Sequence, residues 1–310
     1  MNMYRLKYLV LVGLLALAFA SRADEFTAKH FLPTASEEAQ WTFSGIIADE
    51  EEKQYGYYFQ LARIKDRLSA RAALFDVDTK KVLTQYEANA LLTEDAIKAH
   101  HYHVGHAFLQ FNPINDSWVF GYKRSSKEGF NFRVDMLKPQ ETLPKPEGLG
   151  GGISVMVSQA HALNGHISVP EHAEETFVTA NHAWFREMAT NSPLQATHDV
   201  KGVLCRFIDE SGFYSVSLPE ADALKGAIAG RFDASGKSKP MSQFIDVESH
   251  EGGSTAIRVL SPHQNIVLSE FLQDKNIVAG VAEVEAHKGF CILSADSVGQ
   301  TLNVEGKEDA

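Results

Sequence analysis

Apolar and polar side chains alternate along many short segments of this chain. The clearest example is 129–136, where Phe130, Phe132 and Val134 share one face and Arg133 lies on the other. Because successive side chains of a strand point to opposite sides, this period of two predicts an antiparallel β-strand with one buried face. Comparable runs occur at 41–45, 57–64, 71–77, 104–111, 118–122, 203–208, 213–218, 243–247, 256–260, 276–286 and 289–293. Many short strands separated by turn residues favour an all-β sandwich or barrel.

Helical periodicity is rare in the sequence. Residues 92–100 predict one short helix with Thr93 as its N-cap, and 268–274 is a candidate for a second. The segment 144–152 is rich in Gly and Pro, and we expect it to be a loop. The polar C-terminal residues 304–310 are expected to be a disordered tail.

The first 23 residues have the layout of a secretory signal peptide. Arg5 and Lys7 give a positive start, residues 8–20 form an apolar core, and small residues follow where a signal peptidase reads them. This core is short for a membrane-spanning helix. We therefore predict cleavage near Ser21 or Asp24 and a mature protein that is periplasmic or secreted. The alternative is a membrane anchor that is never cleaved.

Charge and composition exclude some classes of binding partner for this protein. The formal net charge of the 310-residue chain is −11, and cleavage of residues 1–23 would remove three basic side chains and make it −14. No block of Lys and Arg occurs, so neither a nucleic acid nor an anionic membrane surface is the expected partner. Beyond the signal peptide, no segment approaches the length of a transmembrane helix. The 19 Phe, 9 Tyr and 3 Trp predict substantial hydrophobic cores.

Two cysteines, Cys205 and Cys291, each lie on a strand-like run in the last third of the chain. If these runs are the first and last strands of one closed sheet, they are neighbours and near enough for a disulfide. An exported protein meets the oxidising conditions in which such a bond persists. The alternative is a pair of buried free thiols.

Four histidines fall within residues 100–106, a density that suggests a site for Zn²⁺ or Cu²⁺. On an extended strand His101 and His103 share a face, whereas His100 and His106 point to the other. A third ligand would have to come from elsewhere. His101 and His103 are therefore weak metal candidates, the simpler interpretation is a polar barrel rim, and no cofactor is expected.

Two stretches of the chain carry motifs in a recognisable order. They are His30 with 41–45 and 55–63, and then 149–154, 164–169 and 178–187. Together they resemble the hydroxyneurosporene synthase family, which is also called the carotenoid 1,2-hydratase or AttH-like family. The resemblance covers about residues 30–215, and the last third matches by its strand pattern alone. It implies two lipocalin-like antiparallel β-barrels in tandem with a few short helices.

The order of loops and strand-like runs indicates a domain boundary, and the tandem barrels that the resemblance implies suggest a ligand site. The boundary between the barrels is expected around 172–178 or 190–200. The segments we expect are a signal peptide at 1–23, an N-terminal barrel at 24–176, a C-terminal barrel at 177–303 and the tail at 304–310. Barrels of about eight to ten strands can leave an interior for one small apolar ligand. The side chains expected to line or border it are Trp41, Phe43, Tyr57, Phe59 and Trp184.

In the hydratases of this family, a short Asp-His-x-Trp motif is thought to hold catalytic residues. The corresponding string here is Asn181-His182-Ala183-Trp184, which keeps His and Trp but has Asn at the Asp position. An alternative register aligns 183–184 with the Ala-Trp that precedes the motif, and the motif is then lost. In the first register His182 is the proton donor and Trp184 an aromatic wall that steadies a carbocation. His182 lacks an acidic partner nearby, unless a turn brings Glu187 round.

The sequence patterns and the family resemblance together lead to three hypotheses about function. The leading hypothesis is an exported binder of a lipophilic small molecule, either isoprenoid or fatty-acid-like. The first alternative is a hydratase or isomerase that acts on an isoprenoid-like or other apolar substrate. The second alternative is a non-catalytic envelope interaction module whose barrels are filled by side chains. The volume of any internal pocket separates the ligand hypotheses from the filled module.

Overall fold

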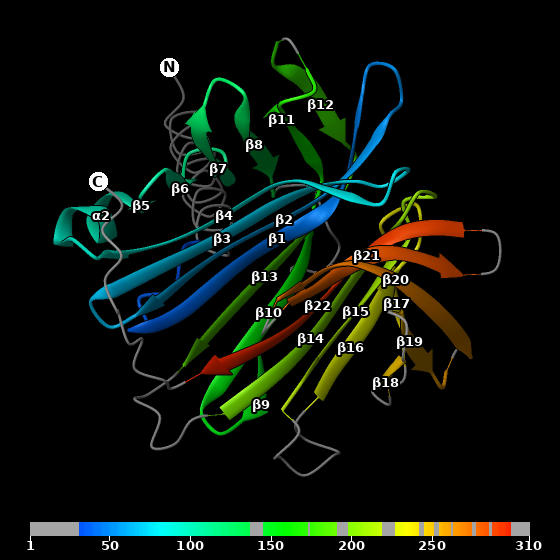
Figure 1. Ribbon diagram of the computed structural model, residues 1–310. Coiled ribbons are helices and arrows are strands. Elements are labelled where there is room, and N and C mark those ends of the chain that lie inside the picture. The colour runs from blue at the N-terminus through cyan, green and yellow to red at the C-terminus, as the bar shows by residue number, and fades with distance from the viewer. Residues whose placement is uncertain are drawn as a thin grey trace, which may run out of the picture.

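The computed structural model of the protein describes residues 31–136, 145–172, 174–190, 198–218, 227–241, 245–250, 254–261, 263–274, 277–284 and 287–298. The predicted signal peptide and tail lie outside these ranges. Within them the chain forms two curled antiparallel sheets and one short helix (Figure 1). The first sheet makes a nearly closed barrel and the second a half-barrel, so the prediction of an all-β fold with two barrels is confirmed.

The first sheet has 13 strands and a ten-strand path in the order β4-β3-β2-β1-β12-β11-β8-β7-β6-β5. Its strands are β1 (Glu38–Asp49), β2 (Gln54–Ile64), β3 (Arg67–Asp76), β4 (Lys81–Leu91), β5 (His101–Val104), β6 (Ala107–Asn112), β7 (Ser117–Ser125), β8 (Glu128–Asp135), β9 (Glu147–Gly150), β10 (Ile153–Ala160), β11 (Ala162–Ser168), β12 (Thr176–Ala180) and β13 (Ala183–Thr190). Strands β13, β10 and β9 branch from β1 towards the second sheet.

The second sheet has nine strands in the order β17-β16-β15-β14-β22-β21-β20-β19-β18. Its strands are β14 (His198–Phe207), β15 (Gly212–Ser217), β16 (Ala227–Phe232), β17 (Ser238–Pro240), β18 (Ile245–His250), β19 (Ser254–Val259), β20 (Gln264–Asp274), β21 (Ile277–Val284) and β22 (His287–Val298). The first and last of these strands in the sequence, β14 and β22, pair in the middle of the sheet.

Tyr86 bridges the gap at which the first barrel closes, between β4 and the β5–β6 hairpin. Its hydroxyl accepts a hydrogen bond from the His106 backbone N–H at 2.7 Å and donates to the Val104 carbonyl at 3.3 Å. Gly105 lies between these residues with a φ of +59°. A Cβ at that position would come within 2.3 Å of the Tyr86 hydroxyl oxygen, so glycine suits both the turn and the closure.

The alternation predicted for 129–136 is present in β8, where Phe130, Phe132 and Val134 are buried and Asn131 and Arg133 are exposed. The neighbouring strand β2 is instead buried on both faces. Its inner face belongs to the aromatic core of the first barrel, and the second barrel packs against its outer face. A strand between two cores cannot show alternation in its burial, because neither face meets water.

The two sheets pack closely against each other. On one side, Tyr58 and Phe75 of the first sheet share a cluster with Phe290 and Ile292 of β22. The ring of Phe290 lies over Gly56, where a Cβ would approach a ring carbon to 2.5 Å. On the other side, side chains of β10 and β13 pack against side chains of β14, β15 and β16. The barrels therefore meet through apolar contacts on both sides.

Three of the predicted elements differ in the structure. Residues 268–274, a candidate helix, belong to β20, where pairing with β19 and β21 overrides the local pattern. The predicted run 104–111 is divided into β5 and β6 by the turn at Gly105. The predicted loop 144–152 contains β9, which pairs with β10.

The one helix among the described residues is α2 (Glu94–Ala99), within the range predicted for it. Thr93 is its N-cap, as predicted, and the Thr93 side chain accepts a hydrogen bond from the Ala96 N–H at 3.3 Å. Sheet membership changes between Thr190 and His198, inside the second of the two intervals considered for the domain boundary. The predicted boundary at 176/177 falls at the start of β12, a strand of the first sheet.

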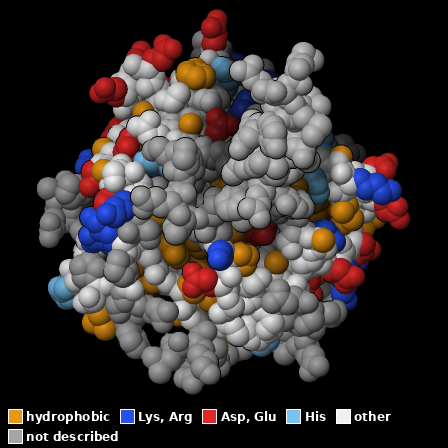
Figure 2. Space-filling view, turned by 180° about the vertical axis from the view of Figure 1, so that it is seen from behind, with side chains coloured by type: hydrophobic (Ala, Val, Ile, Leu, Met, Phe, Trp, Pro, Cys, Tyr) orange, Lys and Arg blue, Asp and Glu red, His pale blue; other side chains and the backbone are white. Residues whose placement is uncertain are grey.

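The described surface carries charges of both signs. On the face drawn in Figure 2, basic and acidic side chains are interspersed around the rim, and apolar side chains gather nearer the centre. Within the described ranges, no helix is both long enough and apolar enough to cross a bilayer.

Candidate functional site

Aromatic rings meet across the interior of the first barrel. Trp41 and Phe43 of β1 and Tyr57 and Phe59 of β2 are completely buried. Phe43 stacks on Phe120 of β7, with ring centroids 4.2 Å apart, although β1 and β7 lie on different walls of the barrel. The four side chains predicted to line a ligand cavity are therefore part of a packed core in this structure. Their part in binding stays a prediction.

Glu187 brings a carboxyl group into this core. It lies on β13, two residues after Phe185, and so faces the first barrel together with that ring. Its Oε2 accepts hydrogen bonds from Trp41 Nε1 at 2.7 Å and from the Thr34 backbone N–H at 3.4 Å. Burial disfavours the charged form and raises the pKa of Glu187 to about 7, although both hydrogen bonds oppose the rise. Glu187 is thus turned away from His182.

The opposite face of β13 belongs to the second barrel. Trp184 is completely buried there and donates a hydrogen bond from Nε1 to the Cys205 carbonyl at 2.9 Å. The guanidinium group of Arg206 lies 4.7 Å from the Trp184 ring centroid, in a cation–π contact. Trp184 therefore packs against Arg206 and helps to position its guanidinium group.

His182 lines a pocket of about 190 Å³ between the two barrels, which we call the junction pocket. Its apolar wall includes Ile46, Ile47 and Ile208, and its polar groups include Arg206 and Glu210. His182 itself is only 7% exposed. Polar groups that converge in a small pocket are the arrangement that acid–base chemistry requires.

Glu210 supplies the acidic neighbour that the local sequence of His182 lacks. Its Oε2 lies 3.8 Å from His182 Nε2, and its Oε1 accepts a hydrogen bond from the Asn181 side chain. Glu210 is at the tip of the β14–β15 hairpin, with a left-handed φ of 65°, and follows Asn181 by 29 residues. No local signal marks it, because the contact depends on how this hairpin folds back against the first barrel.

Arg206 is held by neutral groups. Its Nη1 donates to the Glu210 carbonyl at 2.8 Å. When the Gln159 amide is oriented so that its oxygen faces the guanidinium, that oxygen accepts from Nη1 and Nη2 at 2.9 and 3.0 Å. Burial lowers the pKa of Arg206 to about 10, so the group remains a cation at neutral pH. Tyr57, an electrostatic neighbour of Arg206, has a buried hydroxyl that finds no hydrogen-bond partner among the described residues.

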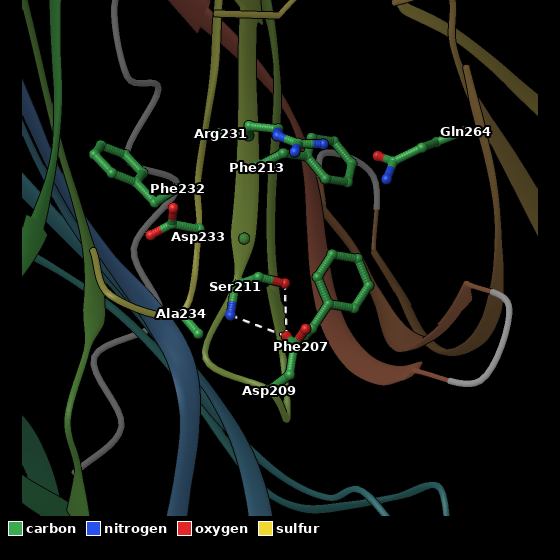
Figure 3. Close-up of a pocket in the computed structure, with 10 residues that line it drawn as sticks. Phe207, Asp209, Ser211, Phe213, Arg231, Phe232, Asp233, Ala234 and Gln264 are labelled. Atoms are coloured by element: carbon green, nitrogen blue, oxygen red, sulfur yellow. Dashed lines mark hydrogen bonds between the residues drawn. The ribbon is translucent and has the colours of Figure 1, made fainter. Parts of the chain in front are cut away.

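A larger cavity, of about 420 Å³, opens beside the same hairpin inside the second barrel (Figure 3). We call it the second-barrel pocket. Phe207 and Phe213 form its apolar wall, Arg231 lies on the next strand, and Gln264 reaches in from β20. Asp209 and Ser211 hydrogen-bond to each other at the hairpin turn. No pattern in the sequence marks any of these residues as part of a ligand site.

The remaining candidates are the cysteines and the histidine cluster. Cys205 and Cys291 are directly opposite on β14 and β22 and form a disulfide in the structure. The rings of His101 and His103 on β5 have centroids 4.3 Å apart. Within the described residues, no group of three or more His, Cys, Asp or Glu side chains is placed to hold a metal ion.

Comparison with known proteins identifies the fold. The sequence matches no family model and no curated protein. Among solved structures, a protein from Nitrosomonas europaea named as a candidate AttH superposes with a TM-score of 0.62 at 14% identity, covering 86% of this chain and 95% of that one. Kievitone hydratase from Nectria haematococca superposes with a TM-score of 0.60 at 11% identity, covering 87% and 92%. The chain therefore has the AttH-like fold of tandem lipocalin-like barrels that the motifs implied.

Proposed function

We propose that the protein binds a lipophilic small molecule, isoprenoid or fatty-acid-like, in the second-barrel pocket. The observation that carries the proposal is the contrast between the barrels. Aromatic rings pack across the interior of the first, whereas a cavity of about 420 Å³ opens beside Phe207 and Phe213 in the second. Its volume lies within the range of roughly 300–1,000 Å³ that is usual for small-molecule pockets, and Phe207 and Phe213 supply apolar surface.

Binding of the neutral fluorescent probe N-phenyl-1-naphthylamine tests this proposal. We expect saturable binding at one site per chain. Replacement of Ala234, an exposed residue that lines the pocket, by Trp should fill the mouth and weaken binding about tenfold or more. The matched control is Ile114→Trp, since Ile114 is 93% exposed on the first barrel.

Two results would count against the proposal. Absence of probe binding by the wild-type protein, together with lipid extracts that contain no ligand, would favour the filled interaction module. Equal loss of binding in Ala234→Trp and Ile114→Trp would place the probe elsewhere on the protein.

A second candidate function is hydration of an apolar alkene in the junction pocket. The observation that favours it is the 3.8 Å approach of Glu210 Oε2 to His182 Nε2, which supplies the carboxylate that Asn181 does not. In such a site His182 would donate a proton to the double bond, and Glu210 would orient its ring and stabilise the imidazolium form. The fold shared with a hydratase is compatible with this chemistry.

The hydratase candidate is tested by incubating the protein with isoprenoid alkenes in oxygen-18 water and measuring labelled alcohol. His182→Ala and Glu210→Gln should each lower the rate by about 10²-fold or more, the usual contribution of a positioned acid or base. His166→Ala is the control, because His166 is exposed on β11. Turnover that survives both substitutions would remove His182 and Glu210 from the mechanism.

We also propose that the protein is exported and works outside the cytoplasm. The layout of residues 1–23 supports this, and a disulfide between Cys205 and Cys291 is of the kind that persists in oxidising compartments. The intact mass of the protein recovered from the periplasm or medium should correspond to a chain that starts near Ser21 or Asp24. Recovery of the protein in the cell with Met1 still present would contradict export.

A further inference from the structure

Arg231 stands on the inner face of the second barrel. It lies on β16 directly opposite Phe213 of β15, which in turn lies opposite Cys205 of β14. Cross-strand neighbours share a face, and Phe213 and Cys205 are buried in the core of this barrel. Arg231 therefore continues an inward-facing row of side chains, and Figure 3 shows it extending beside Phe213.

The nearby carboxylates are engaged with other groups. Asp233 forms an ion pair with Lys239 at 3.1 Å and accepts a hydrogen bond from Ser235 Oγ at 2.6 Å. The Ser235 hydrogen bond and then Lys239 hold the pKa of Asp233 well below its usual value, so its charge is kept and neutralises Lys239. Asp209 accepts hydrogen bonds from the backbone N–H and the hydroxyl of Ser211.

Arg231 itself makes no ion pair or side-chain hydrogen bond within the described part of the chain. A guanidinium group against an apolar wall loses part of its hydration, and an anion that binds to it compensates this loss. Its planar fork of donors matches a carboxylate, which it binds through two parallel hydrogen bonds. Phe207 and Phe213 offer apolar surface beside the same group, and Gln264 faces it from β20.

We propose that the ligand of the second-barrel pocket is an amphipathic carboxylate, with its head group paired to Arg231 and its hydrocarbon part against Phe207 and Phe213. This proposal rests on the proposed binding function and narrows it from lipophilic compounds in general to fatty-acid-like ones. It distinguishes fatty-acid-like ligands from isoprenoid ones, because a neutral isoprenoid has no anionic group that could pair with Arg231.

The test compares dodecanoate with dodecanol, which share a chain and differ in the charged head group. Displacement of N-phenyl-1-naphthylamine is measured for the wild type, Arg231→Gln and the control Arg258→Gln, in which an exposed arginine of β19 is replaced. The wild type should bind dodecanoate about tenfold or more tightly than dodecanol, as expected for a charge-assisted pair. Arg231→Gln should abolish that preference and leave dodecanol binding unchanged, and Arg258→Gln should behave as the wild type.

Arg231→Lys keeps the positive charge and should retain part of the preference for dodecanoate over dodecanol. Added salt should weaken the binding of dodecanoate and leave the binding of dodecanol unchanged. If Arg231→Gln binds the probe and both compounds as the wild type does, the head-group assignment is wrong and the binding function stands. If the wild type binds neither the probe nor either compound, the binding function itself is wrong. Thermal unfolding of each variant shows whether its fold is intact.

Discussion

Glu187 carries a carboxyl group into the aromatic interior of the first barrel, next to Trp41. Burial raises its pKa to about 7, far above the ordinary value for glutamate. The folded protein therefore holds this proton more tightly than the unfolded chain does. Since the unfolded chain ionises first as the pH rises, the free energy of unfolding must fall between about pH 4.5 and pH 7, and this loss is complete above pH 7.

This linkage is tested by urea unfolding of the wild type and Glu187→Gln between pH 5 and pH 8. Relative to the variant, the wild type should lose about 2–3 kcal/mol of stability over that interval. Because Trp41 Nε1 donates to Glu187 at 2.7 Å, the tryptophan emission of the wild type should also titrate near pH 7, and that of Glu187→Gln should not. Parallel stability curves for the two proteins would contradict the assignment.

At the scale of elements, the pairing of β14 with β22 organises the second barrel. These strands are joined in register from His198↔Val298 to Phe207↔Gly289, and the disulfide lies within that ladder. It connects residues 86 positions apart in the sequence, so it removes a long loop from the unfolded ensemble. Among the described strands, β17 and β18 end the order of this sheet and the β14–β22 pair lies near its middle, so the covalent link joins its two halves.

Replacement of both Cys205 and Cys291 by alanine should lower the free energy of unfolding by roughly 4–5 kcal/mol, the value that chain entropy gives for a loop of this length. Chemical denaturation under non-reducing conditions measures the difference. The wild type, denatured without reductant, should contain no thiol that reacts with Ellman's reagent. Two reactive thiols, or a loss of stability within error of zero, would show that the bond does not form.

At the scale of the whole molecule, a buried polar network joins the barrels. Arg186 of β13 forms an ion pair with Asp296 of β22 at 2.8 Å and donates to Ser294 Oγ at 3.0 Å and to Gln40 Oε1 at 2.8 Å. Gln60 of β2 donates to the other carboxylate oxygen of Asp296 at 3.1 Å. Both charged side chains are almost completely buried, so removal of either partner would leave the other charge uncompensated.

Arg186→Met should destabilise the protein by about 3–5 kcal/mol, because it leaves the Asp296 carboxylate buried without its cation. Arg186→Met combined with Asp296→Leu should recover much of this loss, and a double-mutant cycle measures the coupling. The control pair is Arg258 and Glu248, 2.9 Å apart on the surface, whose coupling should be about 0–1 kcal/mol. Equal coupling in the two pairs would show that the interface network adds nothing beyond a surface contact.

The sequence alone determined the features that depend on near neighbours. Alternation along 129–136 indicated which face of β8 is buried, and Thr93 marked the start of α2, because both depend on backbone periodicity and local hydrogen bonds. The order of motifs implied tandem barrels, a fold that the solved structures share. The alternation could not reveal that β2 is buried on both faces, since that depends on the second barrel packing against it.

Only the tertiary structure decided which groups meet across the barrels. Glu210 reaches His182 by way of a hairpin, and Asp296 pairs with Arg186 from 110 residues away. Glu187 lies in the core of the first barrel, whereas His182 lines the junction pocket. The same holds for the packed interior of the first barrel and the open pocket of the second. These contacts depend on strand order, register and sheet curvature, which bring together residues that no local pattern connects.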